Sequence, residues 1–154
     1  MPDLARQALD SFAAAFSPGT APAAPARWEI CLLAFLLVAS AIVRFWGLGS
    51  VGLHAPDEDT MALVAAHLAQ YGEPLFPSGM YYARAIVHTY MIAGSMSLFG
   101  ESEWAMRLPS ATCGVIVVLL AYLIGRRFLQ PVWNLGFVAS VAFLPELIMQ
   151  SQNA

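Results

Sequence analysis

Lysine is absent from this 154-residue chain, and charged residues of all kinds make up only 11% of it. Soluble domains typically contain about 25% charged residues, so the deficit indicates that much of the surface faces lipid rather than water. Seven arginines against ten acidic residues give a net charge of -3, which leaves no basic patch to neutralise a series of phosphates. These shortages exclude nucleic-acid binding and predict an integral membrane protein.

Cysteine is also scarce, because Cys31 and Cys113 are the only two and each lies within an apolar run. Such positions predict unreactive thiols rather than a disulfide or a metal pair. The sequence also contains no paired-histidine zinc pattern, no glycine-rich phosphate loop and no Ser/His/Asp set that spacing alone assembles. These patterns therefore point to no metal-binding motif and no resident cofactor, and metal dependence stays open.

Apolar residues form 59% of the chain and gather in runs that are long enough to cross a membrane. A hydrocarbon core of about 30 Å needs about 20 helical residues, which predicts transmembrane helices over residues 28–48, 107–125 and 133–150. Pro145 and Glu146 interrupt the third run, so its far end is expected to kink or to face the interior of the bundle. Residues 1–27 precede these runs as a predicted cytoplasmic arm, with an amphipathic helix over 3–16 and a Pro/Ala linker over 17–26.

Residues 49–106 separate the first two predicted spans and hold the acidic residues and turn formers that a site would need. Helical spacing predicts two interfacial helices there, at about 57–71 and 84–99. The second rises only about 22 Å, short of a full crossing, although tilting would let it span. If this second helix lies in the interface, the turn at 126–132 is on the cytoplasmic side of the membrane. The positive-inside rule favours that side for the two adjacent arginines of the turn.

The predicted fold class is therefore all-α and integral to the membrane, with three transmembrane helices and a long external loop carrying two interfacial helices. The amino terminus is expected in the cytoplasm of a bacterial cell, with the chain in the inner membrane. The alternative in which 84–99 spans the membrane stays open.

The densest polar cluster is residues 54–59, His-Ala-Pro-Asp-Glu-Asp, at the start of the first interfacial helix. Acidic residues at a helix start are favoured by the helix dipole, and Asp57 after Pro56 is a natural cap, which is a purely structural interpretation. The functional interpretation is that a carboxylate at the membrane surface, Asp57 or Glu58, acts as a general base between a lipid headgroup and an aqueous acceptor.

Arg84 is a second candidate, because a guanidinium beside Tyr81 and Tyr82 at the start of an apolar helix can bind a lipid phosphate. His88 follows one helical turn later and can assist. The structural alternatives are an arginine that extends to the interface and a packed histidine.

The order of several short motifs resembles the polyprenyl-phosphate-sugar-dependent glycosyltransferases of the glycosyltransferase C superfamily. This group includes relatives of the protein mannosyltransferases and of the lipid A aminoarabinose transferase. The similarity extends over about residues 40–154, as the amino-terminal part of such an enzyme. It is carried by Pro56-Asp57-Glu58, Tyr71-Gly72-Glu73-Pro74, Tyr81-Tyr82-Ala83-Arg84, Leu98-Phe99-Gly100-Glu101-Ser102-Glu103, Arg107-Leu108-Pro109-Ser110 and Gly125-Arg126.

The resemblance implies a membrane enzyme that transfers a sugar from a polyprenyl-phosphate carrier to an acceptor on the external face. It assigns Asp57 as the catalytic carboxylate, Glu58 as a supporting residue, and Arg84 as the group near the donor phosphate. Tyr82 and His88 complete the expected substrate-binding set. The donor is a lipid-linked sugar, and no metal is inferred.

Members of this family are several times longer, so two hypotheses follow. The first is that the chain is the catalytic-loop portion of such a glycosyltransferase, expected to be inactive when alone. The second is a non-catalytic small subunit that packs against a larger membrane complex through small residues. Those residues are Gly114, Ala121, Gly125, Gly136 and Ala139.

Overall fold

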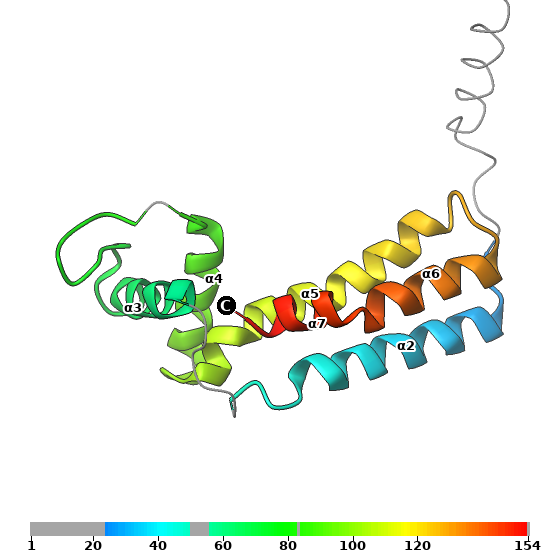
Figure 1. The fold of residues 1–154 in the computed structure, drawn as a ribbon, viewed down its shortest axis with the longest axis horizontal. Coiled ribbons are helices and arrows are strands. Elements are labelled where there is room, and N and C mark those ends of the chain that lie inside the picture. Colours follow the sequence, from blue (N-terminus) through cyan, green and yellow to red (C-terminus); the bar gives the residue numbers. More distant parts are fainter. Residues whose placement is uncertain (1–23, 50–55, 83, 154) are drawn as a thin grey trace, which may run out of the picture.

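The structure, a computed structural model, describes residues 24–49, 56–82 and 84–153, and nearly all of these form helices. The helices are α2 (Arg27–Phe45), α3 (Pro56–Tyr71), α4 (Ile86–Phe99), α5 (Glu103–Gly125), α6 (Pro131–Phe143) and α7 (Pro145–Gln152). Figure 1 shows α2, α5 and α6 side by side along the molecule, with α7 continuing from α6 and with α3 and α4 gathered at one end. The all-α prediction is confirmed, whereas the predicted helix over 3–16 lies outside the described residues.

Two helices, α2 and α5, are long and apolar enough to cross a membrane. The predicted third span is broken at Leu144, where α6 and α7 meet at 49°, and the two count as one span if taken together. The structure thus supports an integral membrane protein with two or three spans. The three-span topology and the interfacial placement of α3 and α4 stay predictions.

Helix α5 begins earlier than the predicted 107–125 because its first turn is capped. Ser102 precedes the helix, and its hydroxyl accepts a hydrogen bond from the backbone N–H of Ala105 at 3.2 Å. A serine at this position satisfies one of the N–H groups that a helix start leaves without an internal acceptor. Four additional residues therefore join the helix before Arg107.

Helix α5 joins two apolar cores. Its first half packs against α3 and α4, and its second half packs against α2 and α6. The first core contains Ala65, Leu68, Ile92, Ala93, Met96, Ala105 and Met106, and the second contains Val118, Tyr122, Leu135, Val138 and Ala142. Because both cores use the same helix, the start of α3 has a defined place relative to the spanning helices.

Pro109 lies inside α5 and helps to dock α4. Proline has no N–H, so the carbonyl of Ala105 four residues earlier loses its helical donor. The buried hydroxyl of Ser95 on α4 donates to that carbonyl at 2.6 Å. The carbonyl that Pro109 leaves without a helical donor thus accepts a hydrogen bond that joins α5 to α4.

Pro145 has a comparable effect at the break between α6 and α7. It removes the donor for the Val141 carbonyl, and the bend separates the Ala142 carbonyl from the next turn. Arg44, buried at the end of α2, donates from Nη1 to Ala142 at 2.8 Å and from Nη2 to Val141 at 3.5 Å. In return, the amide of Gln152 donates to the Val43 carbonyl at the end of α2 at 3.0 Å.

Two glycines of α5 permit close approach within the chain. A Cβ at Gly114 would lie 2.7 Å from the Cβ of Ser151 and 2.8 Å from Nε of Arg44. A Cβ at Gly125 would clash with Oδ1 of Asn134, whereas a Cβ at Gly136 would meet no atom within 4 Å. Gly114 and Gly125, which the subunit hypothesis assigns to a partner, are therefore in contact with other helices of this chain.

Candidate functional site

The start of α3 is fixed by a buried ion pair between Glu58 and Arg107. Arg107 on α5 donates from Nε to Oε1 at 3.4 Å and from Nη2 to Oε2 at 3.3 Å, and its Nη1 also donates to the Leu48 carbonyl at 2.9 Å. Glu58 is 1% exposed and Arg107 is 3% exposed. One arginine therefore ties together the segment after α2, the first turn of α3 and the first turns of α5.

Burial decides what Glu58 can do. A buried carboxylate is stable only when a cation or several donors compensate its lost hydration, and Arg107 provides that compensation. Glu58 is thus held in place beneath the surface, which suits a supporting residue better than a group that meets an acceptor. Asp57 precedes it in the same helical turn, although its side chain and His54 lie outside the described residues.

The expected substrate-binding residues occupy different environments. Tyr82 is 7% exposed, and its ring packs edge-on against Phe76 with centroids 5.4 Å apart. Its backbone N–H donates to the Pro74 carbonyl at 2.9 Å, so Tyr82 fixes the turn between α3 and α4. Arg84, two residues later, is exposed. Their assignment to substrate remains a prediction.

His88 is half-buried on α4 and meets Ser110 on α5, with Nε2 and Oγ 2.9 Å apart. Burial lowers the pKa of His88, because the charged imidazolium loses hydration there. A neutral imidazole can either donate to or accept from the hydroxyl of Ser110. Sequence reasoning did not find Ser110 as a polar partner, although a serine in an apolar helix is a signal for such a contact.

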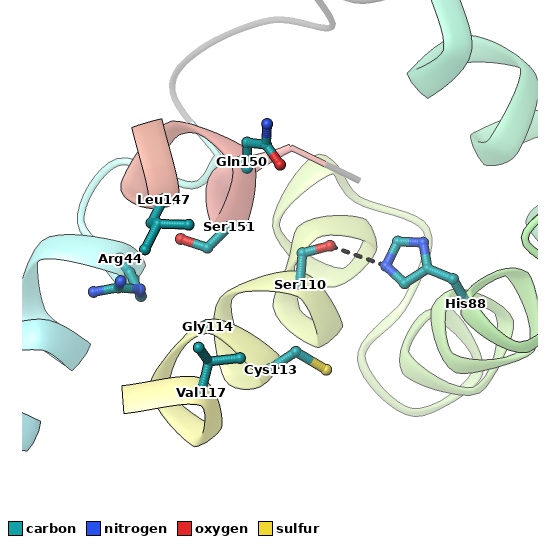
Figure 2. Close-up of a pocket in the computed structure, with 9 residues that line it drawn as sticks. All are labelled: Arg44, His88, Ser110, Cys113, Gly114, Val117, Leu147, Gln150 and Ser151. Atoms are coloured by element: carbon teal, nitrogen blue, oxygen red, sulfur yellow. Dashed lines mark hydrogen bonds between the residues drawn. The ribbon is translucent and has the colours of Figure 1, made fainter. Parts of the chain in front are cut away.

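Two cavities adjoin this histidine, one of about 270 Å³ and one of about 440 Å³. Both are lined by His88, Ser110 and Gln150, as Figure 2 shows for the first of them. Helix α5 runs beneath them, with α4 on one side and α7 on the other. The polar side chains of α7, a helix that the sequence did not separate from α6, therefore belong to the same region as His88.

A second polar cluster lies at the other end of α5. Glu29 is 3% exposed, accepts a hydrogen bond from the hydroxyl of Tyr122 at 2.8 Å and pairs with Nε of Arg126 at 3.5 Å. Arg107 and Arg126 are 19 positions apart on a continuous helical segment, which corresponds to about 28 Å of rise and thus about one hydrocarbon thickness. The Glu58–Arg107 and Glu29–Arg126 pairs therefore mark opposite ends of the bundle.

Sequence reasoning missed the pairing of both arginines. A charged residue next to an apolar run is expected to have a partner inside the bundle, and that was the available signal. Within the described ranges, no three His, Cys, Asp or Glu side chains gather closely enough to hold a metal ion.

Comparisons with a protein family and with individual known proteins agree on the kind of protein that this chain is similar to. Residues 83–153 match the family described as dolichyl-phosphate-mannose-protein mannosyltransferase. An undecaprenyl phosphate-α-4-amino-4-deoxy-L-arabinose arabinosyl transferase of Pseudomonas fluorescens is 34% identical over 111 residues, covering 70% of this chain and 18% of the relative. A second protein of that description, from another Pseudomonas fluorescens strain, is 29% identical over 132 residues, covering 82% of this chain and 23% of the relative.

A third relative of the same description, from Pseudomonas aeruginosa, is 32% identical over 104 residues, covering 66% of this chain and 19% of the relative. No solved structure gives a significant match. The chain spans about a fifth of the length of the curated relatives that it matches. Its similarity to them and its apolar helices establish that this integral membrane protein is a relative of the polyprenyl-phosphate-sugar-dependent glycosyltransferases of the glycosyltransferase C superfamily.

Proposed function

We propose that this chain carries the catalytic loop of a glycosyltransferase that moves a sugar from a polyprenyl-phosphate carrier to an acceptor. The observation that carries the proposal is the Glu58–Arg107 pair, which holds the first turn of α3 at one end of the spanning bundle. Asp57 belongs to that turn. A carboxylate in this position is close to both the headgroup layer and the aqueous phase.

In the proposed reaction, Asp57 accepts the proton of an acceptor hydroxyl while the hydroxyl oxygen attacks the anomeric carbon. The bond between that carbon and the phosphate oxygen breaks, and the polyprenyl phosphate leaves with both bonding electrons. Glu58 positions the helical turn that carries Asp57. Arg84 contributes positive charge near the leaving phosphate, and Tyr82 and His88 shape the substrate site.

The proposed orientation puts this end of the bundle outside the bacterial inner membrane and the amino terminus in the cytoplasm. It is supported by the separation of the two ion pairs along α5 and by the adjacent Arg126 and Arg127 at the opposite end, which the positive-inside rule favours in the cytoplasm. The donor and acceptor would then meet at the outer surface.

The test is the Asp57→Asn variant, produced from the natural gene and assayed in membranes for transfer from a radiolabelled undecaprenyl-phosphate sugar. Loss of a general base is expected to slow transfer by about 100-fold or more. Asp59→Asn is the matched control, because Asp59 is an exposed acid on the same helix. Equal transfer rates for the two variants, at equal protein levels, would remove Asp57 from the proposed role.

A further inference from the structure

The end of the bundle opposite α3 carries an excess of positive charge. Figure 1 shows the first turn of α2, the last turn of α5 and the first turn of α6 together at that end. Within residues 24–30 and 122–134 the charged side chains, with a net charge of +2, are Arg27, Glu29, Arg126 and Arg127. Residues 56–107, which include α3 and α4, carry six acidic residues and two arginines, a net charge of -4. The two ends of the protein therefore attract ions of opposite sign.

One of the three arginines at the positive end is already neutralised. Nε of Arg126 is 3.5 Å from Oε1 of the buried Glu29, and the guanidinium lies over the ring of Tyr122, 5.5 Å from its centroid. By contrast, no ion pair among the described residues includes Arg27 or Arg127, and both side chains are exposed. Two guanidinium groups are therefore available to an anion from outside the chain.

The surroundings of these two guanidinium groups are typical of the boundary between lipid and water. Exposed aromatic residues adjoin or closely follow both arginines in the chain, and tryptophan rings favour the headgroup layer. The two ion pairs of α5 are separated by about 28 Å of helical rise, so this end reaches one boundary of the hydrocarbon core when the α3 end is at the other. We call this region the two-arginine surface, and it consists of Arg27, Trp28, Arg127, Phe128 and Trp133.

The charge of this surface selects among the groups that occur at that depth. A guanidinium presents N–H donors in a planar fork that matches two phosphate oxygens. An arginine near an anionic membrane surface raises the affinity for that surface about fivefold. A zwitterionic headgroup such as phosphatidylcholine carries a quaternary amine beside its phosphate, and this amine repels a nearby guanidinium. Two unpaired arginines therefore favour a phospholipid whose headgroup has a net negative charge.

We propose that the two-arginine surface binds the headgroups of anionic phospholipids, such as phosphatidylglycerol. Arg27 and Arg127 contact the phosphates, and the three aromatic side chains contact the adjoining acyl chains. The pairing of Arg126 with Glu29 means that two arginines, rather than three, take part. This surface is at the opposite end of α5 from the turn that carries Asp57. The inference is therefore independent of the proposed sugar transfer, and a failure of one does not imply a failure of the other.

Brominated phospholipids provide a local test, because bromine on an acyl chain quenches the fluorescence of a tryptophan that the lipid contacts. One variant of the 154-residue chain retains only Trp133, on the two-arginine surface, and a second retains only Trp46, which follows α2 at the opposite end. In each variant the other three tryptophans are replaced by phenylalanine. Quenching in bilayers of brominated phosphatidylglycerol and phosphatidylcholine gives the binding constant of the first lipid relative to the second. We expect about 10 or more at Trp133 and about 1 at Trp46.

Charge variants connect the lipid preference to the two arginines. Arg27→Gln combined with Arg127→Gln, in the protein that retains only Trp133, should lower the relative binding constant to about 1 to 2. Gln130→Ala is the matched control, because Gln130 is an exposed, uncharged residue of the same turn, and this variant should keep the parent value. A constant near 1 at Trp133, equal constants at the two tryptophans, or an unchanged constant in the double arginine variant would overturn the proposal.

Discussion

Arg107 and Glu58 are 49 residues apart in the chain and form a two-point contact, with N···O distances of 3.3 and 3.4 Å, in which both side chains are buried. The contact joins α3 to the start of α5. Since α5 also anchors α2 and α6, this pair connects the turn that carries Asp57 to the membrane-spanning part of the molecule.

Loss of either partner of this pair should destabilise the protein strongly. Glu58→Gln or Arg107→Gln leaves an uncompensated buried charge, which typically costs about 3–5 kcal/mol. Glu103→Gln is the control, because Glu103 is 40% exposed and 3.9 Å from Arg107, so its loss should cost less than about 1 kcal/mol. Thermal unfolding in detergent, followed by circular dichroism, compares the variants. Similar melting temperatures for all three would contradict a structural role of the buried pair.

The close approach at Gly114 predicts opposite outcomes for two glycine substitutions. Gly114→Ala puts a methyl group against Ser151 and Arg44 and should destabilise the chain by about 1–3 kcal/mol through overpacking. Gly136→Ala, in open space within α6, should stabilise it by about 0.5–1 kcal/mol because alanine favours helix. The same unfolding assay measures both, and a Gly114→Ala protein as stable as the parent would show that α5 and α7 are not in close contact.

Pro145 is expected to maintain the bend between α6 and α7. Pro145→Ala restores an N–H for the Val141 carbonyl, so the two helices should straighten and lengthen end to end by about 3 Å. Spin labels at Val132→Cys and Asn153→Cys, with the native cysteines replaced by serine, report that distance by electron paramagnetic resonance. Pro131→Ala is the control, because proline at the first helical position removes no internal hydrogen bond. If the distance between the two spin labels is unchanged in Pro145→Ala, Pro145 does not cause the bend.

The proposed orientation predicts which introduced cysteines an impermeant reagent can reach. With Cys31 and Cys113 replaced by serine, Gln130→Cys in the turn after α5 should react only when the cytoplasmic side is open. Ser102→Cys, before α5, should react in intact cells after the outer membrane is permeabilised. Labelling of both positions from the outside would be incompatible with α5 crossing the membrane once between them.

Protonation of His88 should weaken the folded state. Burial lowers its pKa, so the unfolded chain binds a proton more readily, and the free energy of unfolding falls as the pH decreases below about 6.5. The contribution of His88 is fully present above that pH and is lost below it. His88→Asn should flatten this dependence between about pH 7.5 and pH 5.5, whereas His67→Asn should retain it. Denaturant unfolding at each pH measures the slope, and an unchanged slope in His88→Asn would contradict the assignment.

Some features of the site could be predicted from local pattern, and others could not. The helix that starts at Pro56 was predicted within one residue because proline and three acids suit a helix start. The partner of Glu58 was not predictable, because Arg107 is brought to it only when α3 packs against α5. The contacts of Arg44 were likewise not predictable, because it caps carbonyls of α6 that the bend at Leu144 leaves without donors.

The amino-acid sequence by itself determined that this protein belongs in a membrane, where its helices run and which acids start α3. These properties depend on hydropathy, on proline and on capping groups, all of which act over a few neighbouring residues. Only the tertiary structure decided which charges are buried together, how α7 turns away from α6, and that polar side chains from α4, α5 and α7 line the two cavities beside His88. Those outcomes depend on contacts between residues up to 109 positions apart, which no local pattern specifies.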